Sequence, residues 1–225
     1  MKIPLYISTY NRDDITLRSL TSLFNSSTPE DIEVIIMDDG SNENLQAQLR
    51  SVALEYKWTY QVHRHIGIPL CKVMRIAQDI RIRKLVEKVP YFLVTDADML
   101  YSKDWITALV KLYQETQQPV ITGFDTRTNQ HDLIDDHGHY CTKTSIGGAN
   151  LLIAMDYFEK HPFKIGEEWD WALTTDVKKY GGNLICTLPS IVEHIGHVGA
   201  KAIAQYHDKA VNFIGEEVSA MEIFK

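Results

Sequence analysis

The segment YFLVTDADM, residues 91–99, decides how this 225-residue sequence folds. It begins with an apolar run, which is typical of a strand that helices cover on both faces. It ends with Asp96 and Asp98, separated by one residue. Because residues two apart on a strand point the same way, both carboxylates can face one side of the strand end. The segment therefore predicts a buried strand with a paired-acid site at its carboxyl end.

Similar β-branched, apolar runs alternate with helical patterns along the rest of the chain. Strands are predicted at residues 3–9, 32–39, 60–65, 91–98, 119–124, 150–155 and 183–188. Helices are predicted from residue 13 or 14, at residues 45–54, at residues 72–89 before Pro90, and at residues 105–115. This alternation indicates a Rossmann-like α/β fold with a mostly parallel central sheet flanked by helices, in which ligands bind at the carboxyl ends of the strands.

The composition is that of an ordinary globular protein, with 44% hydrophobic and 24% charged residues. No run approaches the ~20 apolar residues of a transmembrane segment, and the start MKIPLYISTYNR lacks the apolar core of a signal peptide. We therefore expect a cytoplasmic protein. The net charge of -7 argues against a surface built to bind nucleic acid indiscriminately. The cysteines at positions 71, 141 and 186 lack the paired spacing of a zinc site, so we expect buried thiols.

Residues 126–145 interrupt the pattern with a polar stretch that contains three histidines, His131, His137 and His139. Unstructured segments of this length in a compact domain are usually functional lids or disordered loops. Nothing in the spacing fixes a metal geometry for the histidines. We expect a solvated loop here, with an acceptor-covering lid as the alternative.

A second pair of acids, Asp38 and Asp39, ends the strand predicted at residues 32–39. Acids at the end of a buried strand cost desolvation energy unless a partner compensates them. One explanation is helix capping, by Asp39 or Ser41 for one helix and by Asp98 for another. The other is a ligand site, since carboxylate oxygens select Mg²⁺ or Mn²⁺. Such an ion would neutralise the charge on a departing diphosphate.

Five segments, taken in order, resemble the family 2 glycosyltransferases of the GT-A fold. They are STYNR (8–12), MDDGS (37–41), TDADM (95–99), GGANLLI (147–153) and EEWDWALTTDVKKYGG (167–182). An Asp-x-Asp motif alone is weak, but several blocks in the right order are specific. The resemblance implies one GT-A domain over residues 1–225, with a nucleotide-sugar-binding half at 1–125 and an acceptor-binding half at 126–225.

The resemblance also implies a nucleotide-sugar donor, with a UDP-sugar favoured. Tyr10 is expected to stack near the base, and Lys72 and Arg75 to supply positive charge for the pyrophosphate. A solvated basic helix face is the alternative for that pair. The implied donor site comprises Ser8, Thr9, Tyr10, Arg12, Asp39, Lys72, Arg75 and Asp96.

A divalent cation, Mn²⁺ or Mg²⁺, is implied at Asp98. Enzymes of this fold often complete the metal shell with a histidine after the last core strand. His194 fits that place best, and His197 is the second choice.

The last block resembles the family's acidic catalytic motif but places a glutamate where an aspartate is usual. The general base is therefore left open between Glu168 and Asp170. Its carboxylate would take the proton of an acceptor hydroxyl during a single, inverting displacement. The acceptor subsite is expected at Gly148, Trp169 and Trp171, although core packing is an equal alternative for the tryptophans.

Three other classes of protein are weighed against this interpretation. A phosphatase of the haloacid dehalogenase type carries Asp-x-Asp on its first strand, whereas Asp96 follows three predicted strands. A nucleotidyltransferase would carry a glycine-rich basic loop after the first strand. A non-catalytic nucleotide-sugar-binding relative would need no general base. The sequence does not identify the acceptor: a basic stretch at residues 81–88 could meet a polyanion, but a nucleic acid is not favoured.

Overall fold

The computed structural model describes residues 2–127, 131–164, 168–196 and 208–225. The strands are β1 (Ile3–Thr9), β2 (Ile32–Asp38), β3 (Thr59–Val62), β4 (Tyr91–Asp96), β5 (Met99–Tyr101), β6 (Val120–Thr122), β7 (Leu133–Asp136), β8 (Tyr140–Lys143), β9 (Asn150–Ala154), β10 (Leu184–Thr187) and β11 (Val192–His194). The helices are α1 (Asp13–Asn25), α2 (Glu43–Tyr56), α3 (Ile68–Arg83), α4 (Trp105–Thr116), α5 (Met155–Lys160) and α6 (Trp169–Lys179), with 3₁₀ turns η1 (Leu85–Glu87) and η3 (Ala220–Phe224).

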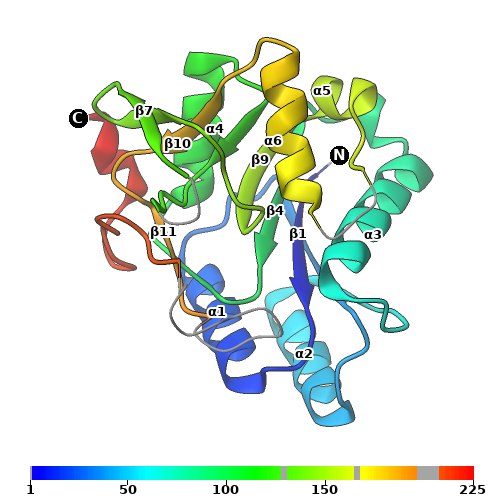
Figure 1. Ribbon diagram of the computed structural model, residues 1–225. Coiled ribbons are helices and arrows are strands. Elements are labelled where there is room, and N and C mark those ends of the chain that lie inside the picture. Colours follow the sequence, from blue (N-terminus) through cyan, green and yellow to red (C-terminus); the bar gives the residue numbers. More distant parts are fainter. Residues whose placement is uncertain (1, 128–130, 165–167, 197–207) are drawn as a thin grey trace.

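The larger sheet of the described residues has nine strands in the order β3-β2-β1-β4-β9-β6-β10-β8-β7. All of them run in one direction except β9 and β8, which are antiparallel to their neighbours. The carboxyl ends of β1 and β4 point toward the side of the molecule where α1 and α2 lie (Figure 1). This arrangement confirms the predicted α/β class, with a mostly parallel sheet flanked by helices.

The buried strands explain why the sequence pattern was informative. Every residue of β1 and of β9 is buried, which matches their continuous apolar character. Around the sheet, α3 packs on β1 and β2, α4 on β6, and α6 on β10. In the described part of the chain, each helix is too short or too polar to cross a bilayer.

The expectation of a loop at residues 126–145 is wrong, because β7 and β8 form an antiparallel hairpin there. Gly138 lies in its turn with a φ of 88°, a conformation that glycine adopts without strain. The hairpin forms the edge of the sheet, and β7 is exposed over most of its length. An exposed edge strand carries no apolar alternation, so its sequence did not distinguish it from a loop.

The acids at Asp39 and Asp98 do not cap helices. The cap of α2 is Asn42, whose side chain accepts a hydrogen bond from the amide of Leu45 (3.0 Å). Asp98 lies in the turn between β4 and β5, several residues before α4 begins. The capping alternative is therefore excluded for both residues.

Candidate functional site

Three parallel strands end side by side and bring the sequence motifs together. The register of β1 with β2 aligns Thr9 with Asp38, and its register with β4 aligns Ser8 with Asp96. Ser8 and Thr9 are buried at this edge, and the Thr9 hydroxyl lies 3.3 Å from that of Thr16. The motifs STYNR, MDDGS and TDADM therefore meet at one edge of the sheet, as their order along the chain predicted.

Asp98 lies at the centre of a charged cluster. The Nη1 of Arg12 donates to Oδ2 of Asp98 (2.9 Å), and the Nε2 of His194 lies 3.1 Å from the same oxygen. The small antiparallel sheet of β11 and β5 places His194 opposite Met99 and so beside Asp98. Burial acts to raise the pKa of Asp98, but His194 and Arg12 outweigh it and lower that pKa below its usual value.

The same contacts act on His194 in the opposite direction. Burial acts to lower the pKa of its imidazole, whereas the hydrogen bond and charge of Asp98 raise it above the usual value. The two shifts agree, since each favours the ionised pair. The structure thus brings together the two residues that were predicted to bind a metal, and their role as metal ligands stays a prediction.

The backbone around Arg12 is held in an unusual conformation. Asn11 and Arg12 have φ values of 53° and 65°, in the left-handed region that non-glycine residues rarely adopt. The amide of Asn11 donates to Oγ of Ser41 (2.8 Å), and the Asn11 side-chain oxygen accepts from the amide of Asn42 (2.9 Å). Ser41 and Asn42 thus fix the turn that directs Arg12 toward Asp98. Backbone strain of this kind clusters at functional sites.

The cluster has side-chain donors of the kind that a divalent cation binds. Among the described residues, Oδ1 of Asp98 has no hydrogen-bond partner although it is buried. Gly196 packs so closely on the cluster that a Cβ there would collide with the Asp98 carboxylate and lie 2.7 Å from Nε2 of His194. One carboxylate and one imidazole form a donor set suited to Mn²⁺. The second-choice ligand, His197, lies outside the described residues.

Asp96 faces a different partner. Because the strand ends at Asp96 and the chain turns, the two aspartates do not share their contacts. The Nζ of Lys72 is buried and binds Oδ1 of Asp96, and it also donates to the carbonyl oxygen of Gly148 (3.1 Å). Burial raises the pKa of Asp96, Lys72 lowers it, and the nearby Asp98 raises it, with a net upward shift. Lys72 therefore bridges the donor motif and the GGAN segment.

The acids of the MDDGS segment are fully buried and hold the chain itself. Asp39 accepts hydrogen bonds from the amides of Ile66 (3.0 Å) and Gly67 (2.9 Å). Asp38 accepts from the Ser41 amide (2.9 Å) and from the hydroxyl of Tyr60 (2.7 Å). In this conformation Asp39 exposes no side-chain surface to a nucleotide, so its role in base recognition stays a prediction that requires the segment at residues 65–67 to move.

Two other predicted donor contacts lie near the same segment. Tyr10 stacks on the imidazole of His65, with ring centroids 4.1 Å apart. Arg75 is half-buried on α3, and its Nη1 donates to the side chain of Gln78 (3.1 Å). Neither contact tests the predicted nucleotide interaction, but both side chains lie beside the loop that Asp39 holds.

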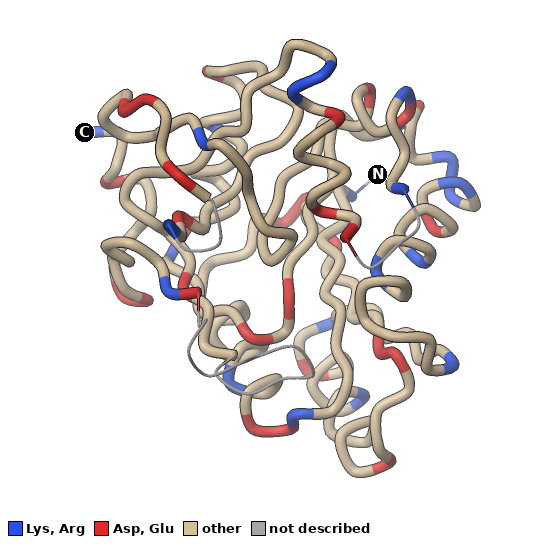
Figure 2. The backbone as a smooth tube through the Cα atoms, viewed as in Figure 1, with Lys and Arg blue, Asp and Glu red and all other residues tan. Residues whose placement is uncertain are grey.

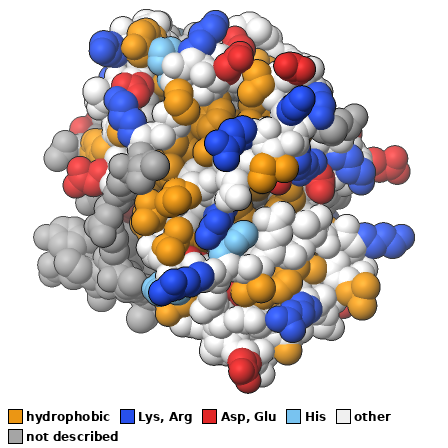
Figure 3. Space-filling view, turned by 90° about the vertical axis from the view of Figure 1, so that its right-hand side faces the viewer, with side chains coloured by type: hydrophobic (Ala, Val, Ile, Leu, Met, Phe, Trp, Pro, Cys, Tyr) orange, Lys and Arg blue, Asp and Glu red, His pale blue; other side chains and the backbone are white. Residues whose placement is uncertain are grey.

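The basic stretch at residues 81–88 lies at the far end of α3, away from the end that begins at Gly67 beside Asp39. Basic residues gather along the right-hand side in Figure 2, where α3 lies, and Figure 3 shows them interspersed with hydrophobic side chains. Arg83 is paired with Glu33 (2.6 Å) and Asp79 (3.2 Å). This stretch therefore does not line the strand-end site.

The acids of the last block differ in where they point. Oδ2 of Asp170 accepts a hydrogen bond from the amide of Gly148 (3.3 Å), whereas Glu168 is exposed at the start of α6. Since the carbonyl of the same glycine is bound by Lys72, Asp170 and Asp96 lie on either side of one residue. The structure thus connects Asp170, rather than Glu168, to the donor motif.

The two tryptophans of this block have different surroundings. Trp169 is only 5% exposed, packs on Phe163 and lies under Nζ of Lys72, whose distance to the ring centre is 5.3 Å. A Cβ on Gly148 would collide with its indole. Trp169 is therefore a core residue that supports the Gly148 segment, which corrects the prediction of a direct acceptor contact. Trp171 is 39% exposed and stacks on His131.

The fold also assembles a buried cluster that the spacing of the cysteines did not reveal. Cys141 on β8 lies opposite Cys186 on β10, and their sulfurs lie within 4.8 Å of each other and of a carboxylate oxygen of Asp125. The ammonium group of Lys143 already binds that carboxylate. All three cysteines are free thiols and buried, as predicted.

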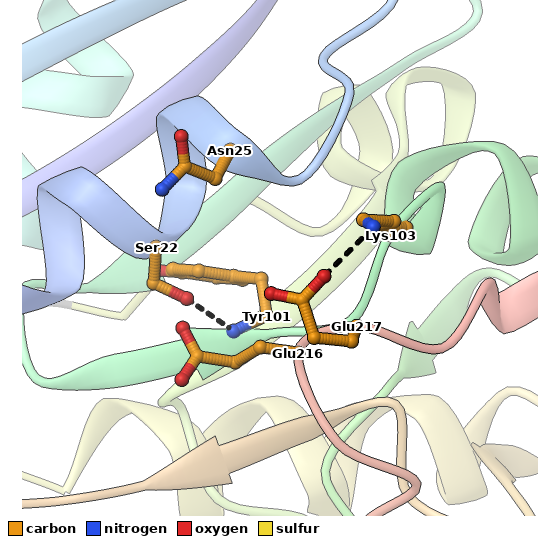
Figure 4. A pocket seen from close by; sticks show the side chains of 6 residues that line it. All are labelled: Ser22, Asn25, Tyr101, Lys103, Glu216 and Glu217. Atoms are coloured by element: carbon orange, nitrogen blue, oxygen red, sulfur yellow. Dashed lines mark hydrogen bonds and ion pairs between the residues drawn. The ribbon is translucent and has the colours of Figure 1, made fainter.

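A pocket of about 290 Å³ lies elsewhere (Figure 4). Its lining residues are Ser22, Asn25, Tyr101, Lys103, Glu216 and Glu217. The charges in it are paired, Lys103 with Glu217 (2.8 Å) and Glu216 with Arg18. The pocket contains none of the residues that the sequence motifs selected.

Comparison with known proteins places this geometry in a family. The family described as Glycosyl transferase family 2 matches residues 5–167, which end just before Glu168. Two chondroitin synthases are similar in sequence, that of Escherichia coli (31% identity over 110 residues, 49% of this chain and 15% of that protein) and that of Pasteurella multocida strain Pm70 (25% over 131 residues, 58% and 13%). The chain thus spans about a seventh of the length of these relatives.

A solved structure has the same fold. A mannosyltransferase from Pyrobaculum calidifontis, in complex with GDP-Man and Mn²⁺, superposes with a TM-score of 0.59 and 14% identity, over 84% of this chain and 56% of that chain. The family match covers most of this sequence and includes all the strand-end motifs. The chain therefore belongs to glycosyl transferase family 2 and has the GT-A fold.

Proposed function

We propose that this protein transfers a sugar from a nucleotide-sugar, with a UDP-sugar favoured, to a hydroxyl of a glycan, with inversion at the anomeric carbon. One observation carries the proposal. Contacts run without a break from Asp96 through Lys72 and Gly148 to Asp170. An acid of the donor motif and a candidate base therefore lie on either side of one short segment, as a single displacement requires.

The donor would lie at the strand ends, with its diphosphate beside Asp98 and its nucleoside toward Tyr10. Asp98 and His194 would hold a divalent cation, Mn²⁺ or Mg²⁺. This ion would neutralise the charge that develops on the departing diphosphate. The guanidinium of Arg12 binds Oδ2 of Asp98 in this structure. It is therefore placed to contact the same phosphates.

Asp170 is the better candidate for the general base, because Glu168 is exposed and has no contact with the Gly148 segment among the described residues. The Asp170 carboxylate would take the proton of the acceptor hydroxyl. The acceptor oxygen then forms its bond to the anomeric carbon as the bond to the diphosphate oxygen breaks. The nucleoside diphosphate leaves with that electron pair, from the face opposite the acceptor.

A glycan acceptor is supported by the two similar chondroitin synthases, since chondroitin is a polysaccharide. The three free thiols support a reducing compartment such as the cytoplasm.

The test is nucleoside diphosphate release from a panel of UDP-sugars and GDP-mannose, with Mn²⁺, with Mg²⁺ and with a chelator. We expect slow hydrolysis of at least one UDP-sugar that requires the metal. Tight binding of a nucleotide-sugar without turnover, with or without oligosaccharides, would instead identify a non-catalytic binding relative. Turnover that survives the chelator would contradict the metal assignment.

A further inference from the structure

Trp171 is an exposed aromatic side chain at the edge of the proposed site. It lies in the first turn of α6, immediately after Asp170. One face of its indole stacks on the imidazole of His131, with centroids 5.7 Å apart and ring planes 20° from parallel. Because a large side chain on a helix surface usually samples several rotamers, this stacking restrains the orientation of the indole.

His131 is suited to this supporting role. Its side chain is only 6% exposed, and Nδ1 lies 2.7 Å from the hydroxyl of Ser145. The other ring nitrogen, Nε2, lies 3.8 Å from the position that a Cβ on Gly147 would take. The imidazole is therefore held between Ser145, which follows β8, and the segment that also bonds to Asp170. His131, which belongs to the polar segment at residues 126–145, is therefore held in a fixed position next to the proposed site.

We propose that Trp171, supported by His131, is the platform on which the terminal pyranose ring of a glycan acceptor lies. This assignment rests on the proposed function and deepens it, because it names the acceptor class and a positioning residue, His131. The axial C–H groups of a pyranose form an apolar face that packs on the electron-rich face of an indole. The hydroxyls at the ring edge are then free to approach the carboxylate of the adjacent Asp170.

Two features distinguish Trp171 from the other aromatic side chains of this region. Trp169 is buried and covered by Lys72 and Phe163, so it offers no face to a ligand. Tyr180, at the other end of α6, is 57% exposed and stacks on His161, but it lies about three helical turns from Asp170. Tyr180 is therefore a matched control for an exposed, stacked aromatic residue that lies away from the site.

The experiment measures binding of fluorescently tagged oligosaccharides that end in a hexose, an N-acetylhexosamine or a hexuronic acid, with UDP and Mn²⁺ present. For the glycan that binds the wild-type protein, Trp171→Ala and His131→Ala should each raise the Kd at least tenfold. Trp171→Phe and His131→Phe should restore most of the affinity, because each keeps a stacked ring. Tyr180→Ala should bind like the wild type, and the affinity of every variant for UDP alone should stay within about twofold.

Folding and function are separated by independent measurements. Near-UV circular dichroism and UDP affinity verify that each variant is folded. Unchanged glycan affinity in folded Trp171→Ala would overturn the platform, and failure of His131→Phe to recover affinity would overturn the supporting role of His131. If no glycan binds although the wild-type protein hydrolyses a nucleotide-sugar, the glycan acceptor and the platform are wrong, while the proposed use of a nucleotide-sugar donor stands. Absence of any nucleotide-sugar turnover would contradict the proposed function itself.

Discussion

The two sides of the proposed site differ in how their charges are compensated. On the donor side, buried acids are neutralised by the chain's own groups, since Arg12 and His194 bind Asp98 and Lys72 binds Asp96. On the acceptor side, Trp171 is exposed, and in the part of the chain that the structure describes Asp170 accepts hydrogen bonds from the backbone amides of Gly148 and Trp171. The donor side is therefore built in advance for a charged ligand. The acceptor side offers one aromatic face and one available carboxylate.

The largest expected effect is on the acceptor side. Asp170→Asn should lower kcat by about 10²–10⁴-fold, the range for loss of a general base, while donor affinity is retained. The matched variant Glu168→Gln should cost far less, because Glu168 points to solvent. Steady-state kinetics with the acceptor that binds will measure both. The reverse ranking would return the base to Glu168.

Removing the ammonium group of Lys72, which compensates the charge of Asp96, tests the donor side. Lys72→Met should lower the free energy of unfolding by up to about 3 kcal/mol, because it leaves a partly buried carboxylate unpaired. The double variant Lys72→Met/Asp96→Asn should recover part of this loss. Lys103→Met, which breaks an exposed pair with Glu217, should cost at most about 1 kcal/mol. Urea denaturation measures the free energy of unfolding of all three variants. Equal losses for Lys72→Met and Lys103→Met would show that the buried Lys72–Asp96 pair stabilises the protein no more than an exposed pair does.

The space beside Asp98 is tested by Gly196→Ala. The added Cβ would collide with the Asp98 carboxylate and crowd His194, so Mn²⁺ affinity should fall about tenfold, within the range that perturbed ligand surroundings produce. Gly147→Ala is the control, since its Cβ would lie 3.8 Å from Nε2 of His131, an ordinary contact distance. Calorimetric titration with Mn²⁺ compares the two. Equal affinities would place the cation elsewhere.

The smallest effect concerns His131. Burial lowers its pKa, Lys143 lowers it further, and Asp208 and Asp170 act in the opposite direction. Below about pH 6.5, the unfolded chain therefore binds a proton at this histidine more readily than the folded chain, and stability falls as the pH falls. Between pH 7.5 and 5.5, the wild-type Tm should drop more than that of His131→Phe. Parallel curves of Tm against pH for the two proteins would show that His131 is not buried as a neutral ring.

The central strands and their acids were predictable because their signals are local. A buried parallel strand needs a continuous apolar run, and the acids that end β2 and β4 follow directly from it. His194 was found through its position after a late strand. The hairpin of β7 and β8 was not predicted, because an exposed edge strand needs no apolar pattern.

The contacts that the sequence did not reveal join separate segments. Lys72 binds Asp96, 24 residues away, while its expected contact with a phosphate stays a prediction. His131 was assigned to a solvated loop, whereas Ser145 of the same segment and Trp171 of α6 contact its ring and bury it. Gly196 was not predicted as a site residue, since the close packing of a glycine is visible only when its neighbours in space are known.

The most direct measurement is anomalous diffraction from crystals grown with UDP and Mn²⁺. The manganese peak should lie about 2.0–2.3 Å from a carboxylate oxygen of Asp98 and from Nε2 of His194, with the diphosphate on its other side and Arg12 turned toward the phosphates. A peak at Asp125, Cys141 and Cys186, or a diphosphate bound away from Asp98, would contradict the account.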